Sequence, residues 1–319
     1  MQVNLTFAPG TTLQQMISFE TAGRLWASHL TDNAAINIHV EPSSILPVGV
    51  AGGALLGVQP DQSYNTWRNR LSADRKTTDD QTVHQNLPSN LTSFTASVDG
   101  VSQTSSTINL SRANAKALGM RGTQNSGLDG YILMNNQLST LGLSWNYNLG
   151  TIPANTVDFL SVAVHEIGHV LGFYSGVDAS GWLLDGITGF EEDEEEDEED
   201  FDQDPRGSLR NATSLDMFRF SDRGTINLSQ GGTPYFSLNS GRTQLGLFST
   251  GTGPDGDGFQ ASHWKSRSTP FEIMEPDIDL AQRRRIINLD RRAMDVIGWD
   301  LGTSSVTLSS LQTQARQSL

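Results

Sequence analysis

His165, Glu166 and His169 stand together in the stretch HEIGH. On a helix, residues four apart project from the same face, so both imidazoles can reach one metal ion. The carboxylate of Glu166 would lie just off that face, where it can take a proton from a water molecule that the metal activates. This combination of residue types at this spacing predicts a hydrolytic zinc site.

The third metal ligand does not follow from this stretch. A catalytic zinc ion commonly takes three protein ligands, and the chain has no cysteine to supply a thiolate. The stretch continues through Gly172 to Ser175, whose neutral hydroxyl is a poor zinc ligand. Three candidates remain: Asp178, an acid between residues 185 and 195, or a distant histidine.

A structural interpretation of the HEIGH stretch is the alternative to a metal site. Both histidines would then be hydrogen-bonded helix residues that bind nothing. Burying two imidazoles and a carboxylate on one apolar helix is costly unless something pairs them, which favours the metal. Elsewhere, His29, His39 and His84 lie in patterns without another ligand signal, and we interpret them as structural or surface residues.

His263 differs because it stands in the stretch ASHWKSRSTPFEIMEP. Together with VHEIGHVLGF, this stretch resembles the metzincin zinc metalloproteases, in particular the leishmanolysin type, in which a long insertion separates the second and third ligands. The resemblance implies that His165, His169 and His263 bind zinc and that Glu166 is the general base. It also implies that Met274 belongs to the Met-turn, the apolar floor under the metal.

Other stretches, among them LPVGVAGGA and LDRRAMDVIGWDL, resemble a group of poorly characterised bacterial secreted metalloproteases. This resemblance implies a secreted or extracytoplasmic protein of a bacterium. The first residues, MQVNLTFAPGTTLQQM, lack the basic and apolar regions of a signal peptide, so the expected location rests on the resemblance.

The acidic charge is concentrated in one segment. The formal net charge is −15, but residues 191–200 are consecutive acids and Asp202 and Asp204 follow, which leaves only −3 for the remainder. Such a run cannot pack, so about 186–208 is predicted to be an exposed loop insertion. Calcium binding, or masking of a cleft, is the alternative for this segment.

Calcium is also the alternative for residues 253–259, GPDGDGF, which we interpret as a turn. The expected cofactors are therefore Zn²⁺ and, at these acidic stretches, Ca²⁺. No basic patch with interleaved aromatic residues is present, which argues against nucleic acid as a partner. No apolar run is long enough to cross a membrane.

Periodicity indicates the elements that would position the motif. Residues 19–42 predict a helix followed by a strand, and residues 47–58 predict a tight turn and a short buried strand. The stretch DGYILMNN, from Asp129, predicts a strand that could be the sheet edge. The motif helix is predicted to begin after an N-cap at Asn155 or Thr156 and to end at Gly172.

Beyond the acidic segment, TSLDMFRF, TPYFSLN and GLFST are typical of short strands, and INLDRRAMDVIGWDL of an amphipathic helix. The fold class expected is α+β and metzincin-like, with a mixed twisted sheet and the active-site helix in an N-terminal catalytic subdomain, residues 1–172. An irregular C-terminal subdomain with the Met-turn, residues 173–302, would follow. Residues 303–319 are predicted to be a flexible tail.

The function expected from this reasoning is a zinc-dependent endopeptidase that binds a protein or peptide substrate in an extended conformation. One alternative is a zinc hydrolase of non-peptide amides. The other is a catalytically silent protein with a metzincin fold that only binds. The sequence gives no indication of the oligomeric state.

Overall fold

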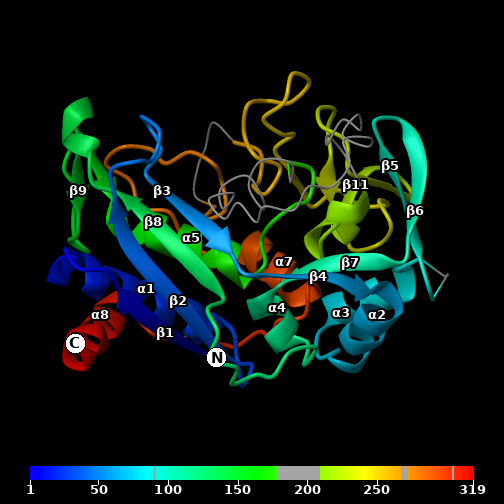
Figure 1. Ribbon diagram of the computed structural model, residues 1–319, viewed down its shortest axis with the longest axis horizontal. Helices are drawn as coiled ribbons and strands as arrows, with labels where there is room; N and C mark the ends of the chain where they lie inside the picture. The colour runs from blue at the N-terminus through cyan, green and yellow to red at the C-terminus, as the bar shows by residue number, and fades with distance from the viewer. Residues whose placement is uncertain (89–90, 179–208, 267–271, 304) are drawn as a thin grey trace, which may run out of the picture.

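The computed structural model describes residues 1–88, 91–178, 209–266, 272–303 and 305–319 (Figure 1). The segment predicted to be an acidic loop insertion, about 186–208, lies outside these ranges.

A four-stranded mixed sheet forms the scaffold of the N-terminal half. Its order is β1 (Gln2–Phe7), β2 (Ala35–Ser43), β8 (Gly130–Asn135) and β3 (Gly52–Leu56). The first three strands are parallel, and β3 pairs with β8 in the antiparallel direction. The prediction of an α+β protein with a mixed sheet is therefore confirmed.

The predicted edge strand is not at the edge. Strand β8 pairs with β2 on one side and with β3 on the other, so the prediction that it receives a substrate strand is wrong. Ile132 and Met134 point into the core, and such alternation occurs in central and edge strands alike. Of the strands that the structure describes, β3 is the edge of the sheet on this side.

Two helices cover one face of this sheet: α1 (Leu13–His29) and α5 (Phe159–Leu171) (Figure 1). A capping box between Thr12 and Gln15 begins α1. The Trp26 indole, fully buried, donates a hydrogen bond to the carbonyl oxygen of Val164 at 2.8 Å. This contact fixes the helix that carries the HEIGH stretch against α1.

Helix α5 begins later than predicted. Residues Thr156–Asp158 form a short strand, β10, that pairs with β9 (Ser144–Asn146), and Asp158 is the N-cap. Its Oδ2 atom accepts a hydrogen bond from the backbone N–H of Ser161 at 3.2 Å. Asn155 has a φ angle of 58°, which an N-cap does not adopt. The predicted end is confirmed, since Gly172 caps the helix with a φ angle of 120°.

A second sheet and several short elements make up the remainder. The second sheet has the strand order β14-β13-β11-β12-β5-β6, and β4 pairs with β7. The bounds are β4 Val58–Ser63, α2 Tyr64–Ala73, α3 Thr78–Asn86, β5 Phe94–Val98, β6 Val101–Ser105, β7 Thr107–Ser111, α4 Arg112–Ala117, η1 Leu138–Leu141, η2 Leu209–Asn211, η3 Leu215–Phe218, β11 Arg219–Asp222, β12 Thr225–Asn227, β13 Tyr235–Phe236 and β14 Gly246–Leu247.

The C-terminal region contains two helices. The predicted amphipathic helix is present as α7 (Asn288–Val296). The predicted flexible tail contains α8 (Leu308–Ser318), which packs on α1, so that prediction is wrong over this range. Leu311 and Ala315, four residues apart, bury one face of α8, and the surrounding polar composition concealed this short apolar pattern.

One hydrophobic cluster runs through both halves of the chain. It includes Phe19 and Trp26 from α1, Ile167 from α5, and Trp264 and Trp299 from the C-terminal half. Trp264 is fully buried, as expected for a core residue, and its indole donates to Asp290 at 2.9 Å. Among the described residues, no helix has the length and apolarity needed to cross a bilayer.

Candidate metal centre

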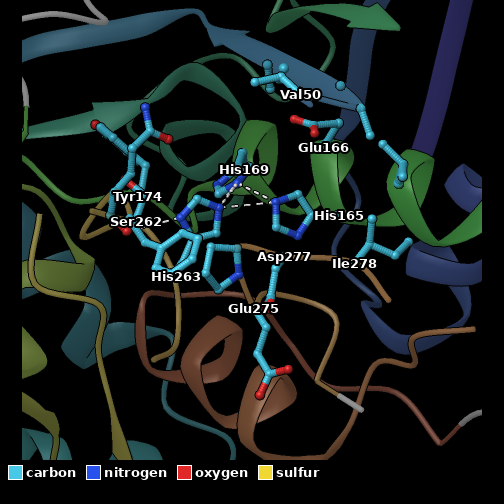
Figure 2. A pocket seen from close by; sticks show the side chains of 18 of the residues that line it. Val50, His165, Glu166, His169, Tyr174, Ser262, His263, Glu275, Asp277 and Ile278 are labelled. Atoms are coloured by element: carbon cyan, nitrogen blue, oxygen red, sulfur yellow. Dashed lines mark hydrogen bonds between the residues drawn. The ribbon is translucent and has the colours of Figure 1, made fainter. Parts of the chain in front are cut away.

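The three histidines of the predicted ligand set converge on one point (Figure 2). His165 and His169 project from the same face of α5, and His263 approaches from the C-terminal half. The Nε2 atom of His169 lies 3.0 Å from that of His165 and 3.2 Å from that of His263, and the third separation is also 3.2 Å. The helix spacing explains the first pair, whereas only the tertiary structure brings in His263.

The other ring nitrogen of each histidine faces a backbone carbonyl oxygen. The Nδ1 atoms of His165, His169 and His263 lie 2.7, 2.7 and 3.0 Å from the carbonyl oxygens of Ile273, Phe173 and Gln260. A carbonyl oxygen can only accept, so each Nδ1 carries the proton. The three Nε2 lone pairs then point towards one another. Ligating histidines in metalloproteins usually have such partners.

These imidazoles are neutral over a wide range of pH. Burial, followed by repulsion from a neighbouring histidine, lowers the pKa of each ring to about 3. The three Nε2 atoms therefore carry no proton at neutral pH, and their lone pairs repel one another. A cation bound between them would attract all three lone pairs. The group can hold a metal ion. In the described part of the chain, no other cluster of potential ligands is this close.

Glu166 lies beside this group on α5 and lines the same cavity (Figure 2). Its side chain is buried, and the loss of solvation raises the pKa of the carboxyl group to about 8. Strand β3 passes very close to it. A Cβ atom added at Gly52 would lie 3.0 Å from Glu166 Oε1 and 2.8 Å from Val162 Cγ1. The missing side chain of Gly52 therefore leaves room for the carboxylate.

Met274 is fully buried and packs against Gly168 of α5. A Cβ atom added at Gly168 would lie only 2.5 Å from the Met274 sulfur, so the glycine of the HEIGH stretch admits this side chain. The carbonyl oxygen of Met274 also accepts a hydrogen bond from the N–H of Trp264 at 3.0 Å. The Met274 turn is thereby joined to the segment that carries His263.

Asp178, a candidate third ligand, has another role. Its carboxylate accepts hydrogen bonds from the N–H groups of Ala261 and Thr252, the latter at 3.0 Å, and it is not a member of the converging group. Nearby, Ser262 Oγ accepts from the N–H of Ser175 at 2.9 Å. The chain after α5 therefore holds the backbone at Ala261 and the side chain of Ser262, directly before His263. The other acidic candidates, between residues 185 and 195, lie outside the described residues.

Asp216 extends this support and was not identified from the sequence. It is fully buried and accepts hydrogen bonds from the Ser175 hydroxyl at 2.5 Å and from the N–H groups of Gly176 and Thr213 at 2.8 and 2.9 Å. The sequence signal for such a role is an acidic residue within the largely apolar stretch SLDMFRF. Such a residue must find several donors when it is buried.

The cavity around these residues has a volume of about 610 Å³. Residues 49–54, which run from the turn before β3 into the strand, line one part of it, and α5 contributes Val162 and Glu166. Segments 258–263 and 275–278 line other parts, and Figure 2 shows Ile278 on the side of His165 and Ser262 on the side of His263. The histidines thus lie within a cleft between the two halves of the chain.

The Asp/Gly-rich stretch 253–259 forms a turn that its own contacts stabilise. Asp257 Oδ1 accepts from the N–H groups of Thr250 at 3.0 Å and Phe259 at 3.3 Å, and Asp257 Oδ2 lies 3.7 Å from the ammonium group of Lys265. These contacts agree with the interpretation as a turn. The carboxylate oxygens of Asp257 are already engaged with donors of the protein.

Comparison with known proteins returns no match among protein-family models, curated proteins or solved structures. The function is therefore inferred from the geometry and chemistry of the site.

Proposed function

We propose that this protein is a zinc-dependent endopeptidase in which His165, His169 and His263 bind the metal. The triangle of Nε2 atoms carries the proposal. A tetrahedral zinc ion with Zn–N distances of about 2.05 Å needs nitrogen atoms about 3.3 Å apart. The observed separations, 3.0 to 3.2 Å, lie close to that value. Three neutral imidazoles suit zinc and leave a fourth position for water.

Glu166 is the general base of the proposed reaction. When bound, the zinc ion would lower the pKa of a water molecule towards about 7 and polarise the scissile carbonyl. The Glu166 carboxylate takes a proton from the attacking water and passes it to the leaving amine. It must be ionised for the first step, and the positive charge of the metal opposes the effect of burial on its pKa.

The edge strand supports a peptide as substrate. Within the described ranges, strand β3 has a sheet neighbour only on the β8 side, and its residues line the cavity next to Glu166. An extended peptide can add to such an edge through main-chain hydrogen bonds, which places its carbonyl groups along the cleft. A small non-peptide amide would make no use of this edge. The edge therefore favours an endopeptidase over other zinc amidohydrolases.

A purely structural zinc site is the less well supported alternative. Structural zinc ions are held by four protein ligands, whereas the described residues supply three. A buried carboxylate such as Glu166 would also be costly without a function. These features favour catalysis over a protein that only binds.

Zinc content and casein cleavage, compared among three variants, test the proposal. We expect Glu166→Gln to keep about one zinc ion and to lose cleavage at least about 100-fold, because only proton transfer is removed. His263→Ala should lose both zinc and cleavage. His84→Ala, outside the site, is the control and should match the wild type. A zinc-free wild type, or a fully active His263→Ala, would show that the assignment is wrong.

A further inference from the structure

Arg284 is buried beside the metal centre without belonging to it. Its side chain is only 4% exposed, and it lines the cavity. The guanidinium group donates to the carbonyl oxygen of Asp277 at 2.6 Å and forms an ion pair with the carboxylate of Glu275. Weaker contacts reach the Glu272 carbonyl oxygen at 3.5 Å and the Asp279 carboxylate at 3.7 Å. One side chain thus contacts the described segment 272–279 at several points.

That segment orients a predicted metal ligand. The carbonyl oxygen of Ile273 lies 2.7 Å from His165 Nδ1, and this contact directs His165 Nε2 towards the other two imidazoles. Met274, next in the chain, packs against Gly168. Any shift of the segment relative to α5 would therefore rotate the His165 ring and disturb the Met274 floor.

The backbone of Arg284 is itself fixed to α5. Its N–H donates to Ser161 Oγ at 2.8 Å, and that hydroxyl donates to Asp158 Oδ2 at 2.8 Å. Ser161 and His165 are four residues apart, so they lie on the same face of the helix. Hydrogen bonds therefore link Ser161 of α5 to Arg284, and Arg284 to the 272–279 segment. The contact between Ile273 and His165 links that segment back to the same helix.

We infer that Arg284 is a positioning residue for His165 and, through it, for the metal; this rests on the proposed zinc site. The planar guanidinium group donates in several fixed directions, so it can bind a carboxylate and a carbonyl oxygen together. A lysine has one ammonium group and cannot reproduce that geometry. Residues that orient metal ligands typically contribute about 10- to 100-fold to metal affinity.

Zinc affinity, measured by competition with a chromogenic chelator, tests the inference. Because Arg284→Met leaves the Glu275 carboxylate buried without its partner, the double variant Arg284→Met/Glu275→Gln is measured beside it. We expect a loss of about 10- to 100-fold in both and of about 10-fold in Arg284→Lys. Arg292→Met removes a bidentate ion pair with Asp79 elsewhere and should stay within about twofold of the wild type.

The visible spectrum of the Co²⁺-loaded proteins separates a positioning role from a general loss of stability. Its bands depend on ligand geometry, so they should shift in the Arg284 variants and not in Arg292→Met. Wild-type affinity and an unchanged spectrum in the folded double variant would overturn the inference.

A failure of the proposed function gives a different result. A wild-type protein that binds zinc but cleaves no peptide would refute the proposed peptidase activity and leave the positioning test intact. A wild type that binds no metal overturns both.

Discussion

At the scale of single residues, absent side chains shape the site as much as present ones. Gly52 lets the edge strand approach Glu166, and Gly168 lets Met274 approach α5. Neither glycine has a positive φ angle, so space rather than backbone freedom explains them. The HEIGH residues would supply the proposed chemistry, and these two glycines permit the contacts around them.

Substitution of Gly52 tests this view of Glu166. A methyl group at Gly52 would press on the Glu166 carboxylate and on Val162. We expect Gly52→Ala to keep zinc and to lower kcat about 10- to 100-fold, because a general base acts only within hydrogen-bonding reach. Zinc content and steady-state cleavage are the measurements. Gly122→Ala is the matched control, since an added Cβ there meets nothing within 4 Å. Equal activity of the two variants would contradict this role.

At the scale of elements, the segment after α5 places the third histidine. Gly172 ends the helix, and the chain then runs through Ser175 and Asp178, whose contacts hold residues 261 and 262. His263 is thereby brought to the first two histidines from 94 residues away. The position of His263 depends on this packing because no local spacing encodes it.

Asp178→Asn tests this anchoring. An asparagine keeps one carbonyl oxygen and replaces the other oxygen with an NH₂ group, which would face one of the two N–H donors. We expect zinc affinity to fall about 10-fold and stability by about 1 to 3 kcal/mol, because a buried donor loses its acceptor. Zinc competition and urea unfolding measure both effects. Asp222→Asn, at an exposed position, is the control. If Asp178→Asn loses all zinc and His263→Ala retains it, the third metal ligand is Asp178 and not His263.

At the scale of the whole molecule, a group of acids joins distant parts of the chain. Asp32 accepts from the N–H of Asp300 at 2.9 Å, and Lys76 forms an ion pair with Asp300. Burial raises the pKa of Asp32 to about 6 and that of Asp295 to about 7. For Asp74, burial and then repulsion from Asp300 and Asp32 raise the pKa to about 7. Asp32, Asp74 and Asp295 therefore oppose folding when they are charged.

The sign of the pH dependence follows from these pKa values. The pKa of Asp74 is higher in the folded state than its ordinary value of 3.8, so the folded state binds more protons. Its contribution therefore destabilises the protein increasingly as the pH rises from about 4 through about 7. Asp74 is also the C-cap residue of α2, and the helix dipole disfavours a negative charge at this end.

Asp74→Asn removes this charge. We expect the variant to be more stable than the wild type by roughly 1 kcal/mol at pH 8, a modest value because solvent screens a part-buried group. The difference should disappear towards pH 4. Urea unfolding of both proteins between pH 4 and 8 measures it, with Asp222→Asn as a charge-matched control. A gain that does not depend on pH would show that the negative charge of Asp74 is not its cause.

The sequence by itself determined the local features of this protein. Four-residue spacing placed His165 and His169 on one helix face, and Gly172 ended that helix, because helix periodicity and terminal backbone geometry are local properties. The helix and strand of residues 19–42 and helix α7 followed from periodicity in the same way. Proximity of His263 to these histidines was expected only from a resemblance, since spacing carries no information over such a distance.

Only the tertiary structure decided which strand is the edge, how α8 packs, and what surrounds the three histidines. The alternation of β8 fits a central or an edge strand, and only the pairing of the whole sheet shows that it lies between two neighbours. The Nδ1 partners of the three histidines are backbone carbonyl oxygens, which every residue possesses and no sequence pattern marks. Arg284 and Asp216 act through contacts between distant segments, so their roles arise only when the chain is folded.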